Sequence, residues 1–322
     1  MILSASRRTD IPAFYSDWFF NRIKEGYLYV RNPMNAHQIS KIELTPELVD
    51  CIVFWTKNPA PMLDRLDELK DYKYYFQFTL TGYGRDIEEC VPNKTKTLIP
   101  IFKELSHKIG KEKVIWRYDP IILNDKYTKD YHLRAFRSIA TELREYTDKV
   151  VISFVDVYDK NKKNLKEIKN VELDNDVDII NEVAKEMSKI AHDNNIVIST
   201  CAEAVDLEKY GIEHNHCIDK ELIEKIIGWK LKAKKDKNQR MECGCVESVE
   251  IGTYNTCKHN CKYCYANYSK ESVINNSKQY DPNSPLLCGV VNANDKITTR
   301  KVKSLKDSPL SDNMYYQPSL FE

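Results

Sequence analysis

Through the first 226 residues, short runs of β-branched and aromatic residues alternate with longer segments of helical periodicity. The runs at residues 51–55 (CIVFW) and 150–155 (VVISFV) are almost entirely apolar, as is typical of parallel strands covered on both faces. Between the runs, apolar residues recur three or four apart, for example from Tyr131 to Leu143 and from Val177 to Ala191, which predicts amphipathic helices. The predicted strands are residues 2–6, 51–55, 74–80, 113–118, 150–155 and 196–200.

Polar residues gather where each predicted strand stops. In an α/β barrel the carboxyl ends of all strands meet at one mouth, whereas a doubly wound sheet has one switch point. Polar residues at every strand end therefore favour a partial or closed (β/α)6 barrel, with the doubly wound sheet as the alternative. Taken singly, each of these residues also fits a helix cap or a turn. They are Arg7, Arg8, Asp10, Thr56, Lys57, Asn58, Thr79, Thr81, Arg117, Asp119, Ser153, Asp156, Ser199, Thr200 and Glu203.

The composition is that of a globular protein with one large domain and an appendage. The chain has 322 residues, of which 42% are hydrophobic, and a mean hydropathy of −0.55. No apolar run approaches the ~20 residues of a membrane span, and the opening MILSASRRTD lacks the features of a signal peptide, so we expect a cytoplasmic protein. The net charge of +1 gives no overall attraction to nucleic acid or lipid. The glycines form neither a dinucleotide fingerprint nor a P-loop.

The cysteines are the most informative part of the composition. Eight of the ten follow residue 200, and in a cytoplasmic chain such a cluster indicates metal or redox chemistry rather than disulfides. Residues 257–264 read CKHNCKYC, a C-x3-C-x2-C pattern whose three thiolates could hold three irons of a 4Fe-4S cluster and leave the fourth iron open. A zinc site completed by Cys243, Cys245 or His259 is the alternative, and the spacing alone does not separate the two.

The residues around this motif, YNTCKHNCKYCYAN, resemble the signature of the radical S-adenosylmethionine (SAM) superfamily, including the aromatic Tyr263 before the third cysteine. The resemblance implies that Cys257, Cys261 and Cys264 bind the cluster, that SAM binds its open iron and is cleaved to a 5′-deoxyadenosyl radical, and that Tyr263 lies near the adenine. In that superfamily the loop usually follows the first strand, whereas here it follows six βα units. A circularly permuted barrel, with residues 246–254 as the displaced first strand, would reconcile the two.

Over nearly its whole length the chain also resembles a bacterial family, the domain of unknown function 1848 family, which is known for a radical-SAM-like cysteine cluster at its C-terminus. This resemblance supports the fold and the cofactor but implies no particular reaction. The segments that carry it are SASRRTDIP at the start, FWTKNP at 54–59, WRYDP at 116–120, STCAE at 199–203 and DPNSPLL at 281–287.

Four further cysteines, Cys201, Cys217, Cys243 and Cys245, have two interpretations. They could ligate a second, fully coordinated cluster, since the glycine of the C-G-C segment allows a tight turn with both sulfurs facing one metal. They could equally be reduced structural thiols, because free cysteine is often simply buried. Of the others, Cys51 is expected in the core, and Cys90 and Cys288 have no evident partner.

The chain changes character after residue 228. Residues 230–240 carry six positive charges against one acid, which fits a solvated helix face or a contact with phosphate. From residue 267 onward, polar residues dominate and periodicity is lost. We predict a barrel core at 1–228, an iron-sulfur segment packed on the barrel mouth at 229–292, and a polar tail at 293–322.

The C-terminal residues QPSLFE resemble the short peptide by which bacterial polymerases and repair proteins dock on the sliding clamp. Gln317, Leu320 and Phe321 would be the anchoring residues, and a tether at the end of a polar tail suits docking. The alternative is that Leu320 and Phe321 pack against their own barrel. Combined with the cysteine motif, the tail makes the spore photoproduct lyases, which repair a DNA lesion by radical SAM chemistry, the nearest analogy.

The sequence therefore predicts a radical SAM enzyme that binds a 4Fe-4S cluster and SAM, receives electrons from an external donor, and acts in DNA lesion repair with clamp docking. Two alternatives are a radical SAM enzyme acting on a small metabolite or peptide, and a non-catalytic iron-sulfur or zinc protein associated with DNA machinery. The candidate catalytic residues are Lys57, Arg117, Asp119 and Glu203; the candidate cofactor contacts are Tyr263, Thr79 and Ser153; the candidate metal ligands are Cys257, Cys261, Cys264, Cys201, Cys217, Cys243 and Cys245.

Overall fold

The computed structural model describes residues 1–156, 161–168, 177–240 and 242–310. Its centre is an eight-stranded sheet in which every neighbouring pair is parallel. The order has two ends, so the sheet is consistent with an open α/β barrel. In spatial order the strands are β11 (Val249–Glu250), β1 (Ile2–Ala5), β4 (Cys51–Thr56), β5 (Tyr74–Thr79), β6 (Val114–Ile121), β7 (Lys149–Phe154), β8 (Val197–Thr200) and β9 (Glu213–His214).

The six strands predicted from the apolar runs are confirmed as β1 and β4 to β8, in parallel and in sequence order. The strand expected within residues 246–254 is also present. This is β11, which pairs in parallel with β1, with Leu3 opposite Val249 and Ser4 opposite Glu250. A late segment of the chain therefore joins the sheet beside its first strand, and the cysteine motif follows directly.

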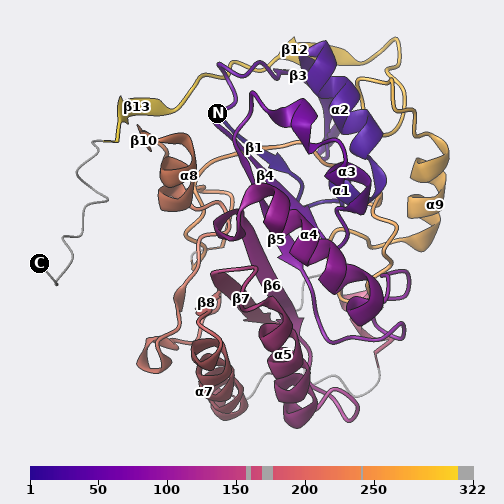
Figure 1. Ribbon diagram of the computed structural model, residues 1–322. Helices are drawn as coiled ribbons and strands as arrows, with labels where there is room; N and C mark the ends of the chain where they lie inside the picture. Colours follow the sequence, from indigo (N-terminus) through magenta and orange to yellow (C-terminus); the bar gives the residue numbers. More distant parts are fainter. Residues whose placement is uncertain (157–160, 169–176, 241, 311–322) are drawn as a thin grey trace, which may run out of the picture.

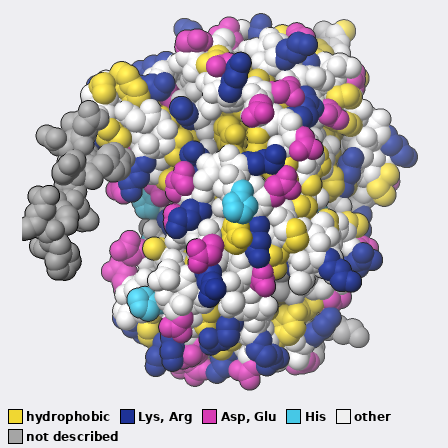
Figure 2. Space-filling view, in the orientation of Figure 1, with side chains coloured by type: hydrophobic (Ala, Val, Ile, Leu, Met, Phe, Trp, Pro, Cys, Tyr) yellow, Lys and Arg dark blue, Asp and Glu magenta, His cyan; other side chains and the backbone are white. Residues whose placement is uncertain are grey.

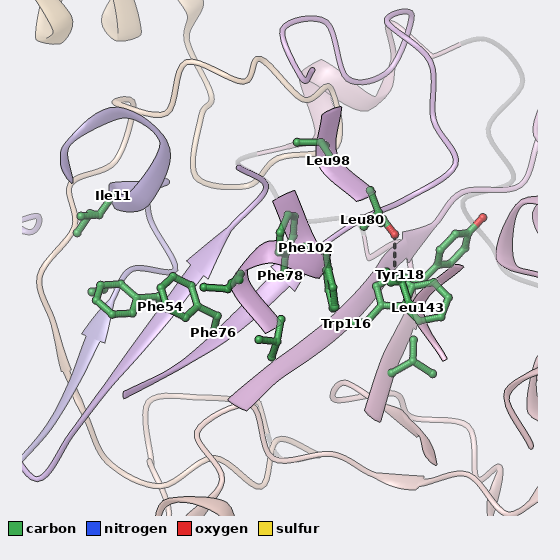
Figure 3. Packing of buried hydrophobic residues seen from close by; sticks show 14 of the residues in the cluster. Ile11, Phe54, Phe76, Phe78, Leu80, Leu98, Phe102, Trp116, Tyr118 and Leu143 are labelled. Carbon is green, nitrogen blue, oxygen red and sulfur yellow. Dashed lines mark hydrogen bonds between the residues drawn. The ribbon is translucent and has the colours of Figure 1, made fainter. Parts of the chain in front are cut away.

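Side chains alternate between the two faces of the strands and pack into two cores. On the helix side, Phe54 stacks on Phe76 with ring centroids 4.7 Å apart, and Trp116 stacks on Phe136 of α5 (Lys129–Leu143) at 4.8 Å. Figure 3 shows Phe54 beside Phe76 in this buried cluster, which also contains Leu98 and Phe102. The opposite face forms a smaller inner core, which consists of Ile2, Cys51, Val53, Tyr75, Ile115, Val151, Ala202, Cys217, Ile218, Ile223, Leu231, Cys243, Cys245 and Val246.

The helices α4, α5 and α7 lie side by side across one face of the strands (Figure 1). The two predicted amphipathic helices are confirmed as α5 and α7. The helices are α1 (Ile11–Phe14), α2 (Ser16–Glu25), α3 (Ala60–Leu63), α4 (Ile99–Ile109), α5 (Lys129–Leu143), α6 (Lys162–Leu165), α7 (Val177–Asp193), α8 (Lys220–Ile227) and α9 (Lys270–Lys278), with single turns at Leu66–Leu69, Lys94–Leu98, Lys111–Lys113 and Glu208–Tyr210.

Helix α5 begins at a side-chain cap. The Oγ1 atom of Thr128 accepts a hydrogen bond from the amide of Tyr131 at 3.2 Å, which satisfies one of the free N–H groups of the first turn. We expect Thr128→Ala to lower the free energy of unfolding by about 1 kcal/mol, measured by urea denaturation. Thr141→Ala, on the exposed surface of the same helix, is the control and should cost nothing, because alanine has the higher helix propensity. Equal losses from both variants would contradict the capping role.

Two small sheets lie outside the main sheet, and the sequence predicted neither. One joins β2 (Tyr27–Asn32), β3 (Asn35–Glu43) and β12 (Lys296–Thr299), and the other joins β10 (Trp229–Leu231) and β13 (Lys306–Pro309). The described part of the predicted tail therefore runs over the surface and pairs with two earlier segments (Figure 1). The domain boundaries at residues 228 and 292 stay a prediction.

The interpretation of residues 230–240 as a helix face is wrong. Helix α8 ends at Gly228, whose φ of +73° is the left-handed conformation that terminates helices, and the next residues form β10. The face in Figure 2 carries positive and negative side chains intermixed rather than a continuous basic area. Within the described residues, no helix is long and apolar enough to span a bilayer.

Candidate functional site

A cavity of about 470 Å³ lies at the carboxyl ends of the strands, within the range of about 300–1,000 Å³ that is usual for small-molecule sites. Every second side chain of a strand points to the same face of the sheet. The residues that line the cavity lie on the same face as the inner core, nearer the carboxyl end of each strand. Ser6 follows β1, Trp55 lies in β4, Thr79 ends β5, Arg117 lies in β6, Ser153 lies in β7 and Cys201 follows β8.

Eleven of the fourteen residues singled out from the sequence line this one cavity. The remaining three do not. Glu203 lies beside the cavity, where its Oε2 accepts a hydrogen bond from the amide of Phe154 at 3.2 Å and burial raises its pKa. Cys257 and Cys261 are not among the lining residues. The cavity-lining residues of that set are Lys57, Thr79, Arg117, Asp119, Ser153, Cys201, Cys217, Cys243, Cys245, Tyr263 and Cys264.

The cysteine loop, residues 257–264, begins a few residues after β11. Cys261 is buried, whereas Cys257 and Cys264 are half-buried. Burial raises the pKa of all three thiols. Negative charge on Cys261 or Cys264 would raise the pKa of Cys257 further, so the three sulfurs are close enough to interact electrostatically. The Lys57 ammonium acts in the opposite direction on Cys261 and Cys264. Lys57 is thus the positive group that offsets thiolate charge in this loop.

Asp10 fastens the cysteine loop to the carboxyl end of β4. One carboxylate oxygen accepts a hydrogen bond from the amide of Lys57 at 2.7 Å and lies 2.8 Å from Nε2 of His259. The other oxygen accepts from Oγ1 of Thr56 at 2.8 Å. His259 also packs on the ring of Phe14, with ring centroids 4.6 Å apart. The ring nitrogen Nε2 of His259, a residue considered above as a zinc ligand, is therefore engaged by Asp10.

Glu88 is the second anchor of the cysteine loop, and sequence reasoning missed it. Its fully buried carboxylate accepts hydrogen bonds from Nζ of Lys57 at 2.7 Å, from Oγ1 of Thr81 at 2.9 Å, and from Lys94 and the Tyr263 hydroxyl. Burial alone would raise the pKa of the Glu88 carboxyl, but the ammonium groups of Lys57 and Lys94 hold it well below its usual range. Burial likewise disfavours the charged form of Lys57, yet Glu88 raises its pKa overall.

No motif marks Glu88, because it lies in an irregular segment and its partners are distant in sequence. The backbone strengthens the link, since Glu88 forms an isolated bridge with Cys261, and the amide of Lys262 donates to the carbonyl of Ile87 at 3.0 Å. The candidate catalytic residue Lys57 and the candidate cofactor contact Tyr263 are thus held by one buried carboxylate.

Arg117 and Asp119, both predicted as catalytic, form an ion pair at the cavity wall. Nε of Arg117 lies 3.1 Å from Oδ1 of Asp119, and Nη1 donates to the sulfur of Cys217 at 2.8 Å. Although burial opposes it, the charges of Asp119 and Cys217 raise the pKa of Arg117 well above its ordinary value, so the guanidinium stays charged. It favours the thiolate form of Cys217.

Cys201, Cys217, Cys243 and Cys245 also meet at this wall. The sulfurs of Cys201 and Cys217 are 3.3 Å apart. Hydrogen bonds from Cys201 and Cys245, with Arg117 beside them, lower the pKa of Cys217, whereas the contact with Cys217 raises that of Cys201. Among the described residues, no group of three or more His, Cys, Asp or Glu side chains is arranged to hold a single metal ion. The anchors Gln317, Leu320 and Phe321 lie outside the described residues.

These features define a class of protein: an open, all-parallel α/β fold whose strands end at a cavity lined by Cys264 of the cysteine loop and by four other cysteines. The chain belongs to the family described as domain of unknown function (DUF1848), whose sequence model matches residues 2–266. The match covers most of the chain and ends just beyond the cysteine loop. No curated protein and no solved structure matched the chain.

Proposed function

We propose that this chain is a radical SAM enzyme with a circularly permuted barrel. The observation that carries the proposal is the position of the C-x3-C-x2-C loop, which follows a strand paired with β1 and borders the cavity at the carboxyl ends of the parallel strands. In the radical SAM superfamily the cysteine loop also follows a strand, but that strand is usually the first in the sequence. Here the same strand-then-loop arrangement comes late in the chain, beside β1.

The residues of the cysteine loop suit a 4Fe-4S cluster. Three thiolates that bind three different irons need not converge on one point, as the ligands of a single ion must. When bound, such a cluster supplies an open iron for SAM and an electron for its reductive cleavage to methionine and a 5′-deoxyadenosyl radical. In this proposal Cys257, Cys261 and Cys264 are the ligands, and Lys57 balances part of their negative charge.

The other cavity residues would bind SAM and substrate and exclude water. Trp55 and Tyr263 offer aromatic surfaces to an adenine ring, and the hydroxyl groups of Thr79 and Ser153 can bond polar groups of the ligand. Glu88 keeps Lys57 and Tyr263 in place. Because Arg117 is already paired with Asp119 and Cys217, we assign it to the cavity wall rather than to proton transfer.

The substrate is assigned from sequence alone. DNA lesion repair depends on the clamp-docking residues Gln317, Leu320 and Phe321, which lie outside the described residues, so it stays a prediction. A small metabolite or peptide stays the alternative substrate.

Anaerobic reconstitution with iron and sulfide tests the proposed chemistry. With dithionite as the electron donor, the reconstituted chain should convert SAM to 5′-deoxyadenosine and methionine, measured by chromatography and mass spectrometry. The same protein without dithionite is the control and should form neither. A reconstituted protein that retains zinc, binds no iron and forms no 5′-deoxyadenosine would overturn the proposal.

A further inference from the structure

Four cysteines outside the C-x3-C-x2-C loop form a second group on the same cavity. Cys201 follows β8, Cys217 follows β9, and Cys243 and Cys245 lie between β10 and β11. The sulfurs of Cys201 and Cys217 are 3.3 Å apart, and Cys245 is within hydrogen-bonding reach of both Cys217 and Cys243. Three segments that are distant in the sequence thus bring four thiols to one wall.

The backbone holds these segments together closely. The amide of Ile218 donates to the sulfur of Cys245 at 3.3 Å, and the amide of Val246 donates to the carbonyl of Ile218 at 3.2 Å. A Cβ atom on Gly244 would lie 2.6 Å from Nε2 of the exposed His216 side chain, so a larger residue between the two cysteines would require that ring to move. The four thiols therefore meet because of specific packing rather than through general burial.

Two guanidinium groups flank the four thiols. Arg117 donates to the sulfur of Cys217 at 2.8 Å, and the negative charge of Cys245 or Cys217 would act directly on Arg7. The Nε and Nη2 atoms of Arg7 are buried and have no hydrogen-bond partner. Buried donors are almost always paired, and two arginines favour thiolates over thiols. The positive charges of Arg7 and Arg117 and the unpaired N–H groups of Arg7 indicate that an anionic group binds here and accepts hydrogen bonds from Arg7.

The four thiols on one wall match the ligand set of a cubane, which takes one thiolate at each of four irons. The sulfurs of Cys201 and Cys217, now in contact at 3.3 Å, would turn apart to reach separate irons. N–H groups directed at the sulfurs, here from Ile218 and from the Asn215 side chain at 3.4 Å to Cys217, are a typical feature of such sites.

We propose that Cys201, Cys217, Cys243 and Cys245 ligate a second 4Fe-4S cluster at the wall of the cavity. With a thiolate on each of its four irons, this cluster has no open position, so it serves as a one-electron carrier rather than as the site of SAM. The assignment does not depend on the radical chemistry proposed for the loop.

Iron and sulfide content after anaerobic reconstitution tests the second site. The wild-type chain should hold about eight irons, the triple variant Cys257→Ala/Cys261→Ala/Cys264→Ala about four, and the double variant Cys243→Ser/Cys245→Ser about four. A chain with all five substitutions should hold almost none. Cys90→Ser, at an exposed thiol, is the control and should match the wild type. Circular dichroism establishes that each variant is folded.

The outcomes separate the two proposals. If the triple variant is folded and holds no iron, the second site is refuted, whether or not the cysteine loop of the wild type binds a cluster. If it keeps about four irons while the double variant holds none, the second site stands and the loop cluster fails. As a check that needs no variant, iodoacetamide should label the four cysteines of the reconstituted wild type only after a chelator removes iron. A disulfide between Cys201 and Cys217 in the anaerobic wild type would also overturn the proposal.

Discussion

Replacing Cys261 by alanine is expected to reduce 5′-deoxyadenosine formation to the background of the protein-free reaction. Cys261 is 7% exposed, and its backbone is bridged to Glu88, so the loop can keep its path when only the sulfur is removed. A cubane held by two protein thiolates is poorly retained, and without it the electron needed to cleave SAM has no route. The measurement is the anaerobic dithionite assay, with iron content determined on the same sample.

Cys90→Ser is the matched control for this variant. The amide of Cys90 donates to the carbonyl of His259 at 3.0 Å, so its backbone contacts the same loop, but its side chain is exposed. It should keep wild-type iron content and wild-type 5′-deoxyadenosine formation. Undiminished SAM cleavage by the Cys261 variant would show that the loop does not bind the catalytic cluster.

Glu88→Gln is expected to give the largest loss of stability, about 3–5 kcal/mol in the free energy of unfolding at neutral pH. The carboxylate is fully buried between Lys57 and Lys94, whose side chains are 12% and 18% exposed. Removing its charge leaves two ammonium groups close together in a poorly solvated place, which is costlier than the loss of the ion pairs themselves. Urea denaturation monitored by circular dichroism measures the change.

The neighbouring Glu89 provides the control for Glu88. It forms an ion pair with Lys270 at 3.0 Å in which both side chains are about half exposed. Solvent screens such a pair, so Glu89→Gln should cost about 0–1 kcal/mol. In addition, Lys94→Met should restore part of the stability of the Glu88→Gln chain, because it removes one of the uncompensated charges. Equal losses at positions 88 and 89 would contradict the buried network.

The loss caused by Glu88→Gln should also depend on pH. Lys57 and Lys94 hold the folded-state pKa of Glu88 well below its ordinary value of 4.5. A group with a depressed folded pKa contributes stability that is fully present above its unfolded pKa and is lost as the pH falls toward the folded pKa. The difference between the wild type and Glu88→Gln should therefore be constant above about pH 5 and shrink below it. Denaturation series between pH 3 and pH 8 would reveal this trend.

Local patterns in the sequence determined the strands and the spacing of the cysteine loop. Strands β1 and β4 to β8 were predictable because each is a short, largely apolar run, and burial on both faces favours apolar residues. The spacing from Cys257 to Cys264 lies within eight consecutive residues, so its geometry is local as well. Strand β11 has only two residues, and the resemblance to the radical SAM superfamily predicted it rather than its hydrophobicity.

The tertiary structure alone decided which residues hold the site together. Glu88 carries no motif and Asp10 was one of many polar residues at the strand ends, yet each reaches the cysteine loop from a segment more than 170 residues away. The surface sheets that β12 and β13 complete were likewise decided only by folding. Folding also brings together Cys201, Cys217 and Cys245, which the sequence offered either as ligands of one cluster or as buried thiols. Ion pairs and the pairing of edge strands depend on which segments lie close together in space. The periodicity of apolar residues along the chain does not contain that information. The sequence by itself therefore determined the strands and the cysteine spacing, whereas folding decided the carboxylate anchors, the contact among Cys201, Cys217 and Cys245, and the cavity that these cysteines and Cys264 line.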